Sequence, residues 1–172
     1  MRKSVNAYIR KFVGKNRDKI VVVNISMSQV ATIINLGPFT IPYTQSLILE
    51  RTHDKVAGIF DARAIQALGK KGVVFVFSSG NAGLIRFDTH PLLDNVLFVC
   101  AVSEDGQLAK YSSWGFDMDV ATFGHIYEGK INGTSFAAPR ITAALVQYLR
   151  NNPELSITEA INQLKQKATP IK

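Results

Sequence analysis

The chain has 172 residues, of which 47% are hydrophobic and 19% charged, so it carries enough apolar side chains for a folded core. No apolar stretch approaches the roughly 18 residues that span a bilayer. The first twelve residues do not form a signal peptide, because Arg10 and Lys11 interrupt their apolar positions. A single cysteine excludes an internal disulfide and a cysteine zinc cluster.

The formal net charge is +7, and it is concentrated at the amino terminus. Residues 1–19 hold seven cations against one anion, Asp18, so the other residues together are nearly neutral. A basic segment can bind nucleic acid or a membrane surface. We expect a solvated helix face instead, with no nucleic-acid and no membrane partner, because no aromatic stacking platform accompanies the cations.

The first predicted elements are a helix over residues 2–17 and a strand over Lys19–Met27. The helix has apolar residues at helical spacing, and its cations lie mostly on the other face. Its apolar positions are Val5, Tyr8, Ile9, Phe12 and Val13. The strand, KIVVVNISM, is an almost continuous β-branched run, which predicts burial on both faces in a parallel sheet.

A long connection follows, marked by Gly37-Pro38 and Pro42, and residues 36–55 are interpreted as an insertion. A second helix is predicted over residues 56–71, with Gly72 ending it. Its inward-facing residues are expected to be Val56, Ile59, Phe60, Ala64, Ala67 and Leu68.

Three further strands and two helices complete the expected elements. The strands are Val73–Ser79, Val96–Val102 and a shorter one around Asp119–Thr122. The first helix runs from about Ser135 to Asn151, kept thin by Ala137, Ala138, Ala143 and Ala144. The second opens with a capping box, Ser156 to Glu159. Buried strands alternating with helices predict an α/β fold with a parallel sheet.

The segment Ile131–Pro139, INGTSFAAP, is the most specific stretch in the sequence. Gly133 and Thr134 form a tight turn that would place Ser135 at a helix N-terminus. The free N–H groups there favour a developing oxyanion. Pro139 is tolerable in or just beyond the first turn. An ordinary alternative is that Thr134 or Ser135 serves only as the helix N-cap.

Three other segments accompany this motif. The turn FSSGNAG at residues 77–83 directly follows a predicted strand, VNISMS occupies residues 23–28, and residues 96–124 contain AVSEDGQLAKYSSWG and DVATFG. In this order and spacing, the four segments resemble the subtilisin-like serine peptidases, the subtilase family (peptidase S8). The resemblance covers nearly the whole chain.

The resemblance implies a doubly wound parallel sheet with helices on both faces and hydrolysis of peptide bonds through an acyl-enzyme. By motif, Ser135 would be the nucleophile and Asn81 the side-chain donor of the oxyanion hole. Substrate-binding positions would be Ser26, Met27, Ser28, Ser79 and Gly80. Ser28 stands where the family usually has glycine. The expected partner is a polypeptide substrate, and no cofactor and no metal site are expected.

The family's acid and base lie in an Asp-Thr/Ser-Gly and a His-Gly-Thr motif, and this sequence has neither. None of its three histidines, His53, His90 and His125, is followed by Gly-Thr. We therefore expect residues 1–172 to form one partial domain, truncated on its N-terminal side. Alone, this chain is expected to be inactive.

Two other interpretations can be compared with this one. An α/β-hydrolase requires a histidine after the nucleophile, and none follows Ser135. A truncated pseudoprotease that binds peptides or proteins remains an alternative. Either way the strand at Lys19–Met27 would be an unprotected edge, which predicts self-association or a completing N-terminal segment. Cys100 is expected to be buried and inert, and the compartment stays open.

Overall fold

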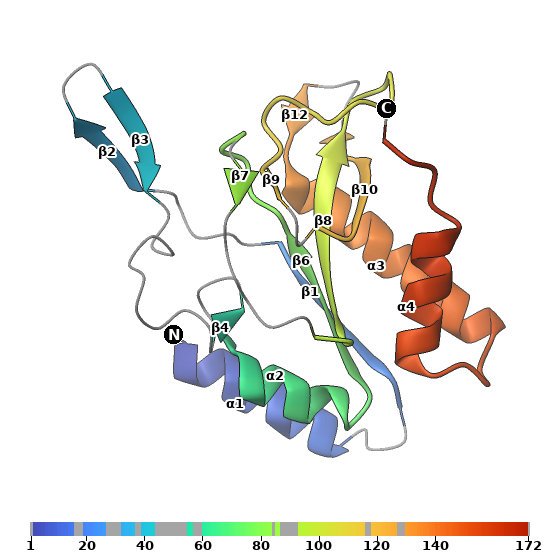
Figure 1. The fold of residues 1–172 in the computed structure, drawn as a ribbon. Helices are drawn as coiled ribbons and strands as arrows, with labels where there is room; N and C mark the ends of the chain where they lie inside the picture. Colours follow the sequence, from blue (N-terminus) through green and yellow to red (C-terminus); the bar gives the residue numbers. More distant parts are fainter. Residues whose placement is uncertain are drawn as a thin grey trace.

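The computed structural model describes residues 2–15, 19–26, 32–36, 39–43, 55–56, 60–83, 85–86, 93–115, 118–126 and 130–171. Its centre is a four-stranded parallel sheet in the order β1-β6-β8-β10 (Figure 1). The four strands are β1 (Val21–Ile25), β6 (Val73–Ser78), β8 (Val96–Val102) and β10 (Val120–Phe123). The parallel sheet predicted from the sequence is confirmed.

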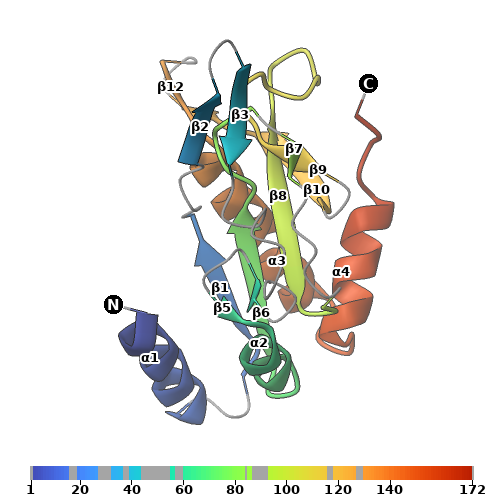
Figure 2. The ribbon, with the colours of Figure 1, turned by 60° about the vertical axis from the view of Figure 1, so that its left-hand side comes forward.

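Helices cover both faces of this sheet. Two lie on one face, α1 (Arg2–Lys15) and α2 (Ala62–Gly69), and two on the other, α3 (Thr134–Asn151) and α4 (Ile157–Gln166); Figures 1 and 2 show the two layers from different sides. Each face has its own core. Phe75, Phe77 and Phe98 pack toward α1 and α2, whereas alternate residues such as Val76 and Val99 pack toward α3 and α4.

The inner strands are buried throughout and the first strand is not. All six residues of β6 are buried, as continuous apolar runs of parallel sheets require. In β1, however, Val21–Val23 are only half-buried and Asn24 is exposed. The predicted burial of this strand on both faces is therefore wrong. The reason is its position, because among the described residues β1 pairs only with β6 and forms the end of the sheet.

Helix α1 contacts the sheet along a narrower stripe than its pattern suggested. Ile9 and Val13 are buried. Tyr8 and Phe12 are instead 69% and 45% exposed, and their rings stack on each other at the surface. The helix thus packs through one ridge, and the two aromatic residues beside that ridge face solvent. The side chain of Val5 lies outside the described residues.

Helix α2 is shorter than predicted and begins at Ala62. Residues placed in its first turns form a small antiparallel pair instead, β4 (Lys55–Val56) with β5 (Phe60–Asp61). Leu68 is buried as expected, but Ala67 is exposed, and Ile65 supplies the inward position instead. The helix ends at Gly69, and Gly72, at a φ of 81°, lies in the turn that leads to β6.

Helix α3 packs along its whole length through one face, on which Leu145 and Leu149 are buried as well as Ala137 and Ala138. Ala143 and Ala144 are exposed, so the expectation that all four alanines keep the packed helix thin is wrong for these two. Pro139 lies inside the helix, just beyond its first turn, as expected. The small residues therefore serve mainly to bring the N-terminus of α3 close to the sheet.

The remaining strands are short pairs outside the central sheet. A hairpin of β2 (Thr32–Leu36) and β3 (Phe39–Tyr43) occupies part of what the sequence suggested was an irregular connection, and it projects from the body in Figure 1. The other pairs are β7 (Ile85–Arg86) with β9 (Trp114–Gly115), and β11 (His125–Ile126) with β12 (Ile131–Asn132). The rest of the 36–55 segment, apart from β4, lies outside the described residues.

The last helix begins as predicted. The Ser156 hydroxyl accepts from the Glu159 N–H while the Glu159 carboxylate accepts from the Ser156 N–H, so the capping box is confirmed. Further along the helix, Lys165 donates to the Asp119 carboxylate, which ties α4 to the segment before β10. In the part of the chain that the structure describes, no helix is long and apolar enough to cross a membrane.

Asn95 joins α2 to the sheet and provides a test of this packing. Its buried side-chain amide donates to the carbonyls of Ile65 and Val73, at 3.1 and 3.0 Å. We predict that Asn95→Ala lowers the free energy of unfolding by about 1–3 kcal/mol, because both bonds are lost in a buried site. Urea unfolding of the wild type and the variant measures this free-energy difference. The exposed Asn162→Ala in α4 is the matched control, and equal effects of the two variants would contradict the role of Asn95.

The capping box predicts a pH dependence. Hydrogen bonds from the Ser156 hydroxyl and N–H lower the pKa of Glu159. A carboxyl whose pKa is lower in the folded state stabilises the fold above its unfolded pKa of about 4.3, and this contribution is lost as the pH falls. Glu159→Gln keeps an acceptor but cannot titrate. Its urea midpoint should therefore fall less than the wild-type midpoint between about pH 6 and pH 3; parallel curves would refute this.

Candidate functional site

Three segments meet at the carboxyl ends of the first two sheet strands. Ser26 directly follows β1, the turn Ser79–Gly83 follows β6, and Gly133–Ser135 begins α3. They meet because α3 packs across β1 and β6 with its buried first turns. Residues far apart in the sequence, Ser26 and Ser135 above all, are thereby brought into direct contact.

Ser135 and Ser26 bind each other through a reciprocal pair of hydrogen bonds. The Ser135 hydroxyl donates to the Ser26 carbonyl at 3.1 Å, and the Ser26 hydroxyl donates to the Ser135 carbonyl at 3.1 Å. The Asn24 Nδ2 donates to the Ser26 hydroxyl at 2.8 Å, and the Thr142 hydroxyl of α3 donates to the Asn24 Oδ1 at 3.3 Å. This network fixes the start of α3 against the end of β1.

Asn81 is attached to the same helix terminus. Its Oδ1 accepts from the Thr134 N–H at 2.8 Å and from the Thr134 hydroxyl at 2.9 Å. The Thr134 hydroxyl in turn accepts from the Gly80 N–H at 3.1 Å. Thr134 is completely buried. The turn after β6 and the start of α3 are therefore held together by three hydrogen bonds.

This arrangement shows that neither Thr134 nor Ser135 acts as the N-cap of α3. The N-cap is Gly133, which has extended backbone and no capping side chain. The first N–H of the helix is satisfied instead by the side chain of Asn81, more than fifty residues earlier in the chain. The simple N-cap interpretation of this motif is therefore wrong.

Two N–H donors remain at this point. Because the Asn81 Oδ1 is held by Thr134, its Nδ2 is turned the other way, 3.3 Å from where a Cβ on Gly133 would lie. Among the described residues, neither this Nδ2 nor the Ser135 backbone N–H has a hydrogen-bond acceptor in the structure. A side-chain amide and a helix N-terminal N–H beside a hydroxyl can together receive a negatively charged oxygen.

The other predicted binding positions are only partly described. Gly80 has a φ of 107°, which favours glycine and lets the chain turn directly after Ser79. Ser79 as a whole is 2% exposed; its N–H donates to the Val99 carbonyl at 2.9 Å and its hydroxyl lies 3.4 Å from that of Ser112. Met27 and Ser28 lie outside the described residues.

The sequence did not identify Thr134 as part of the site. It was considered only as a possible cap, although its side chain is what orients Asn81. The available signal was its position directly before the candidate nucleophile, in a segment already expected to lie at a helix N-terminus. A buried hydroxyl there requires partners, but sequence alone does not reveal which side chain supplies them.

His125, the one histidine among the described residues, makes no hydrogen bond to Ser135. His125 lies in β11, with its Nε2 at 3.5 Å from the Glu104 carboxylate and its ring against Phe123. His53 and His90 lie outside the described residues. Among the residues that the structure describes, no group of three or more His, Cys, Asp or Glu side chains could hold a metal ion.

Cys100 lies in β8 at 3% exposure, as the sequence predicted. Its thiol donates to the Ser113 carbonyl at 3.3 Å.

The site around Ser135 is built from hydroxyls, side-chain amides such as that of Asn81, and backbone N–H groups. These groups can orient and stabilise charge, but none of them is a general base.

Comparison with known proteins identifies the family of this chain from its sequence. Residues 2–170 match the model of the subtilase family. Subtilisin BL of Lederbergia lenta is 28% identical over 117 residues, which cover 63% of this chain and 44% of that protein. Subtilisin DY of Bacillus licheniformis is 29% identical over 119 residues, 62% of this chain and 43% of that protein. The chain therefore corresponds to less than half the length of these relatives.

The fold is similar to that of solved subtilisin-like structures. A cold adapted subtilisin-like serine proteinase superposes with a TM-score of 0.67 at 19% identity, over 97% of this chain and 55% of that chain. This likeness supports the α/β architecture. The family match extends over almost every residue, and it establishes the relationship independently of the site. This chain belongs to the subtilase family, peptidase S8.

Proposed function

We propose that this chain supplies the nucleophile and the oxyanion hole of a subtilisin-type serine endopeptidase. Ser135 attacks the carbonyl carbon of a peptide bond, and the resulting oxyanion binds between the Asn81 Nδ2 and the Ser135 N–H. The observation that carries the proposal is the double hydrogen bond from Thr134 to the Asn81 Oδ1. It leaves the Nδ2 as the donor on the side of Ser135.

The proposed reaction needs one further group. A serine hydroxyl becomes nucleophilic when a base accepts its proton as the bond to carbon forms. The base then returns that proton to the leaving amine, and water releases the acyl group by the reverse sequence. The Ser26 carbonyl, which now accepts from the Ser135 hydroxyl, is far too weak a base for this step. The incoming base must take over that hydrogen bond.

We propose that the His and Asp motifs come from a completing segment, which in the family order lies before the substrate-binding strand. Peptide substrate would extend along Ser26–Ser28 on one side and the Ser79–Gly80 backbone on the other. The outer edge of β1 has no partner strand among the described residues, so it can accept a strand of that segment. Without it, the chain hydrolyses peptides poorly or not at all.

The test is covalent labelling of Ser135. We expect a fluorophosphonate to label the chain rapidly only after refolding with the segment of a related subtilase that precedes its substrate-binding strand. Ser135→Ala should abolish labelling, and Asn81→Ala should slow it by about 10²–10³-fold; this magnitude is measured for the corresponding donor in subtilisin. Mass spectrometry identifies the labelled residue, and the labelling rate gives the size of each effect.

Exposed Ser156→Ala serves as the control, because Ser156 lies at the start of α4 outside the site and its loss should leave the rate unchanged. Rapid labelling of the lone chain that disappears in Ser135→Ala would show that the base is already present. Failure of the completed wild-type chain to label at Ser135, with the completed fold verified by circular dichroism, would overturn the proposed nucleophile.

A peptide-binding or protein-interaction module, a truncated pseudoprotease, is the second candidate. The observation that favours it is the same free edge of β1, because unpaired strand edges bind other chains. In that case the edge of β1 would bind a peptide or a protein strand without hydrolysing it. The sequence encoded upstream separates the two: an Asp-Thr/Ser-Gly motif and a His-Gly-Thr motif there would favour the peptidase, and a stop codon there would favour the interaction module.

Both candidates predict that the isolated chain self-associates through β1. The Val21 N–H donates to the Gly72 carbonyl beside β6, so by strand alternation the Val22 N–H points to the open edge. Val22→Pro removes that donor without removing a bond to β6. Sedimentation at high concentration should show dimers for the wild type and for Val22→Ala, and mainly monomer for Val22→Pro. A monomeric wild type would contradict the prediction.

A further inference from the structure

We propose that Ser113 is a positioning residue for the oxyanion hole, which it serves by holding the turn that carries Asn81. The inference deepens the proposed function and rests on it, because Asn81 is a donor to substrate only if Ser135 is the nucleophile. Ser113 lies between β8 and β10, directly before β9, and it is 4% exposed. It has no direct contact with Ser135 in the structure.

Ser113 binds the Asn81 turn on both sides of Asn81. Its N–H donates to the Gly80 carbonyl at 2.9 Å, and its hydroxyl accepts from the Ala82 N–H at 3.3 Å. The residues directly before and after Asn81 are thus attached to one buried serine. Asn81 itself is exposed, so the position of its amide depends on these two neighbours and on Thr134.

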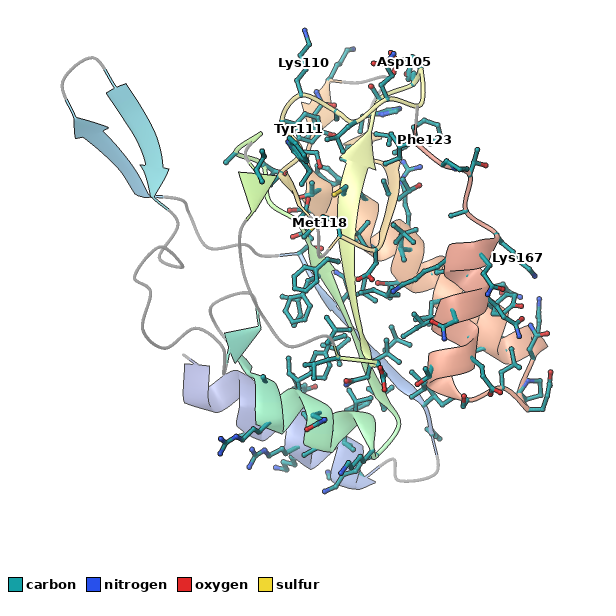
Figure 3. The ribbon with its side chains drawn as sticks, in the orientation of Figure 1. Asp105, Lys110, Tyr111, Met118, Phe123 and Lys167 are labelled. Atoms are coloured by element: carbon teal, nitrogen blue, oxygen red, sulfur yellow. The ribbon has the colours of Figure 1, made fainter. Side chains whose placement is uncertain are left out.

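The backbone beside Ser113 extends the same contact. The Gly83 N–H donates to the Tyr111 carbonyl at 2.8 Å. Gly83 has a φ of 64°, and a Cβ there would lie 2.5 Å from the Lys110 carbonyl oxygen, so the two segments meet with no room for a side chain. Figure 3 shows Lys110 pointing away from the body of the molecule, while its backbone lies against this turn.

Tyr111 links this segment to the other half of the site. Its hydroxyl donates to the Gly124 carbonyl at 2.9 Å, and that carbonyl also accepts from the Gly133 N–H at 2.8 Å. Burial raises the pKa of Tyr111, which keeps the hydroxyl a donor. Residues 111–113 therefore contact the turn that carries Asn81 directly, and they are linked to the backbone that begins α3 through the Gly124 carbonyl. They are placed to fix the distance between the two oxyanion donors.

Position matters here because a donor stabilises an oxyanion only at about 2.7–3.1 Å and with the right direction. A displacement of 1 Å can cost up to about 10²-fold in rate. Ser113→Ala leaves the backbone bond to Gly80 but frees the Ala82 N–H to bind water. Only one of the two hydrogen bonds between Ser113 and the neighbours of Asn81 then remains. The Asn81 amide becomes more mobile and is less often placed to donate to the oxyanion.

The neighbouring Ser112 provides a matched control. It is 1% exposed, and its hydroxyl accepts from the Ala101 N–H in β8 at 2.9 Å. The same hydroxyl lies 3.4 Å from the Ser79 hydroxyl and donates to the Ser113 carbonyl at 3.2 Å, but it binds neither Gly80 nor Ala82, the two neighbours of Asn81. Ser112→Ala and Ser113→Ala thus remove the same group at almost the same burial. A general loss of stability should appear in both variants, whereas a displaced Asn81 should appear only in Ser113→Ala.

The first measurement is amide hydrogen exchange in the chain as it is. The Thr134 N–H reports on Asn81, because it donates to the Asn81 Oδ1. In Ser113→Ala this amide should exchange about tenfold faster, while Val76 at the centre of β6 stays unchanged and Ser112→Ala has no such effect at Thr134. Unchanged Thr134 exchange, or equal acceleration at Thr134 and Val76, overturns the proposal.

The second measurement is phosphonylation of the completed protein. Ser113→Ala should slow labelling of Ser135 about tenfold in wild type and have no further effect in an Asn81→Ala background, since it acts through Asn81. Equal slowing in both backgrounds overturns the inference. If Ser135 is not labelled in the completed wild type, the proposed function fails, and Thr134 exchange still decides whether Ser113 positions Asn81.

Discussion

The hydrogen bonds between the Asn81 Oδ1 and Thr134 are the interaction on which the site depends. They satisfy the first N–H of α3, which its own N-cap, Gly133, leaves without a side-chain partner. In the proposed mechanism, they also leave the Asn81 Nδ2 available to the oxyanion. One contact therefore serves both the fold, as a helix cap supplied from another element, and the proposed chemistry, as the orientation of a donor.

The sheet explains why this contact can form. Parallel strands end at the same edge, so β1 and β6 deliver Ser26 and Asn81 side by side. Small residues in the first turns of α3 then bring its N-terminus against that edge, where Ser135 reaches Ser26. The part of the chain that matches Subtilisin BL covers 44% of that protein.

Much of this could be predicted from local sequence. Continuous apolar runs identified β6 and β8, and the Ser156–Glu159 spacing identified the capping box. The failures concern features that depend on neighbours. Burial of β1 depends on whether a strand pairs beyond it, and the exposure of Ala143 depends on which face of α3 meets the sheet, the face that buries Ala138 and Leu145. Similarly, Ser135 and Asn81 were identified by motif, but the role of Thr134 depends on a contact between residues 53 positions apart.

The most direct measurement is a crystal structure of the completed protein after phosphonylation of Ser135. The account predicts a phosphoryl oxygen within about 3 Å of both the Asn81 Nδ2 and the Ser135 backbone N–H. It also predicts that the Thr134 bonds to the Asn81 Oδ1 are retained and that the hydroxyl's bond to the Ser26 carbonyl is lost. A phosphoryl oxygen directed to solvent, with the Asn81 amide turned away, would contradict the account.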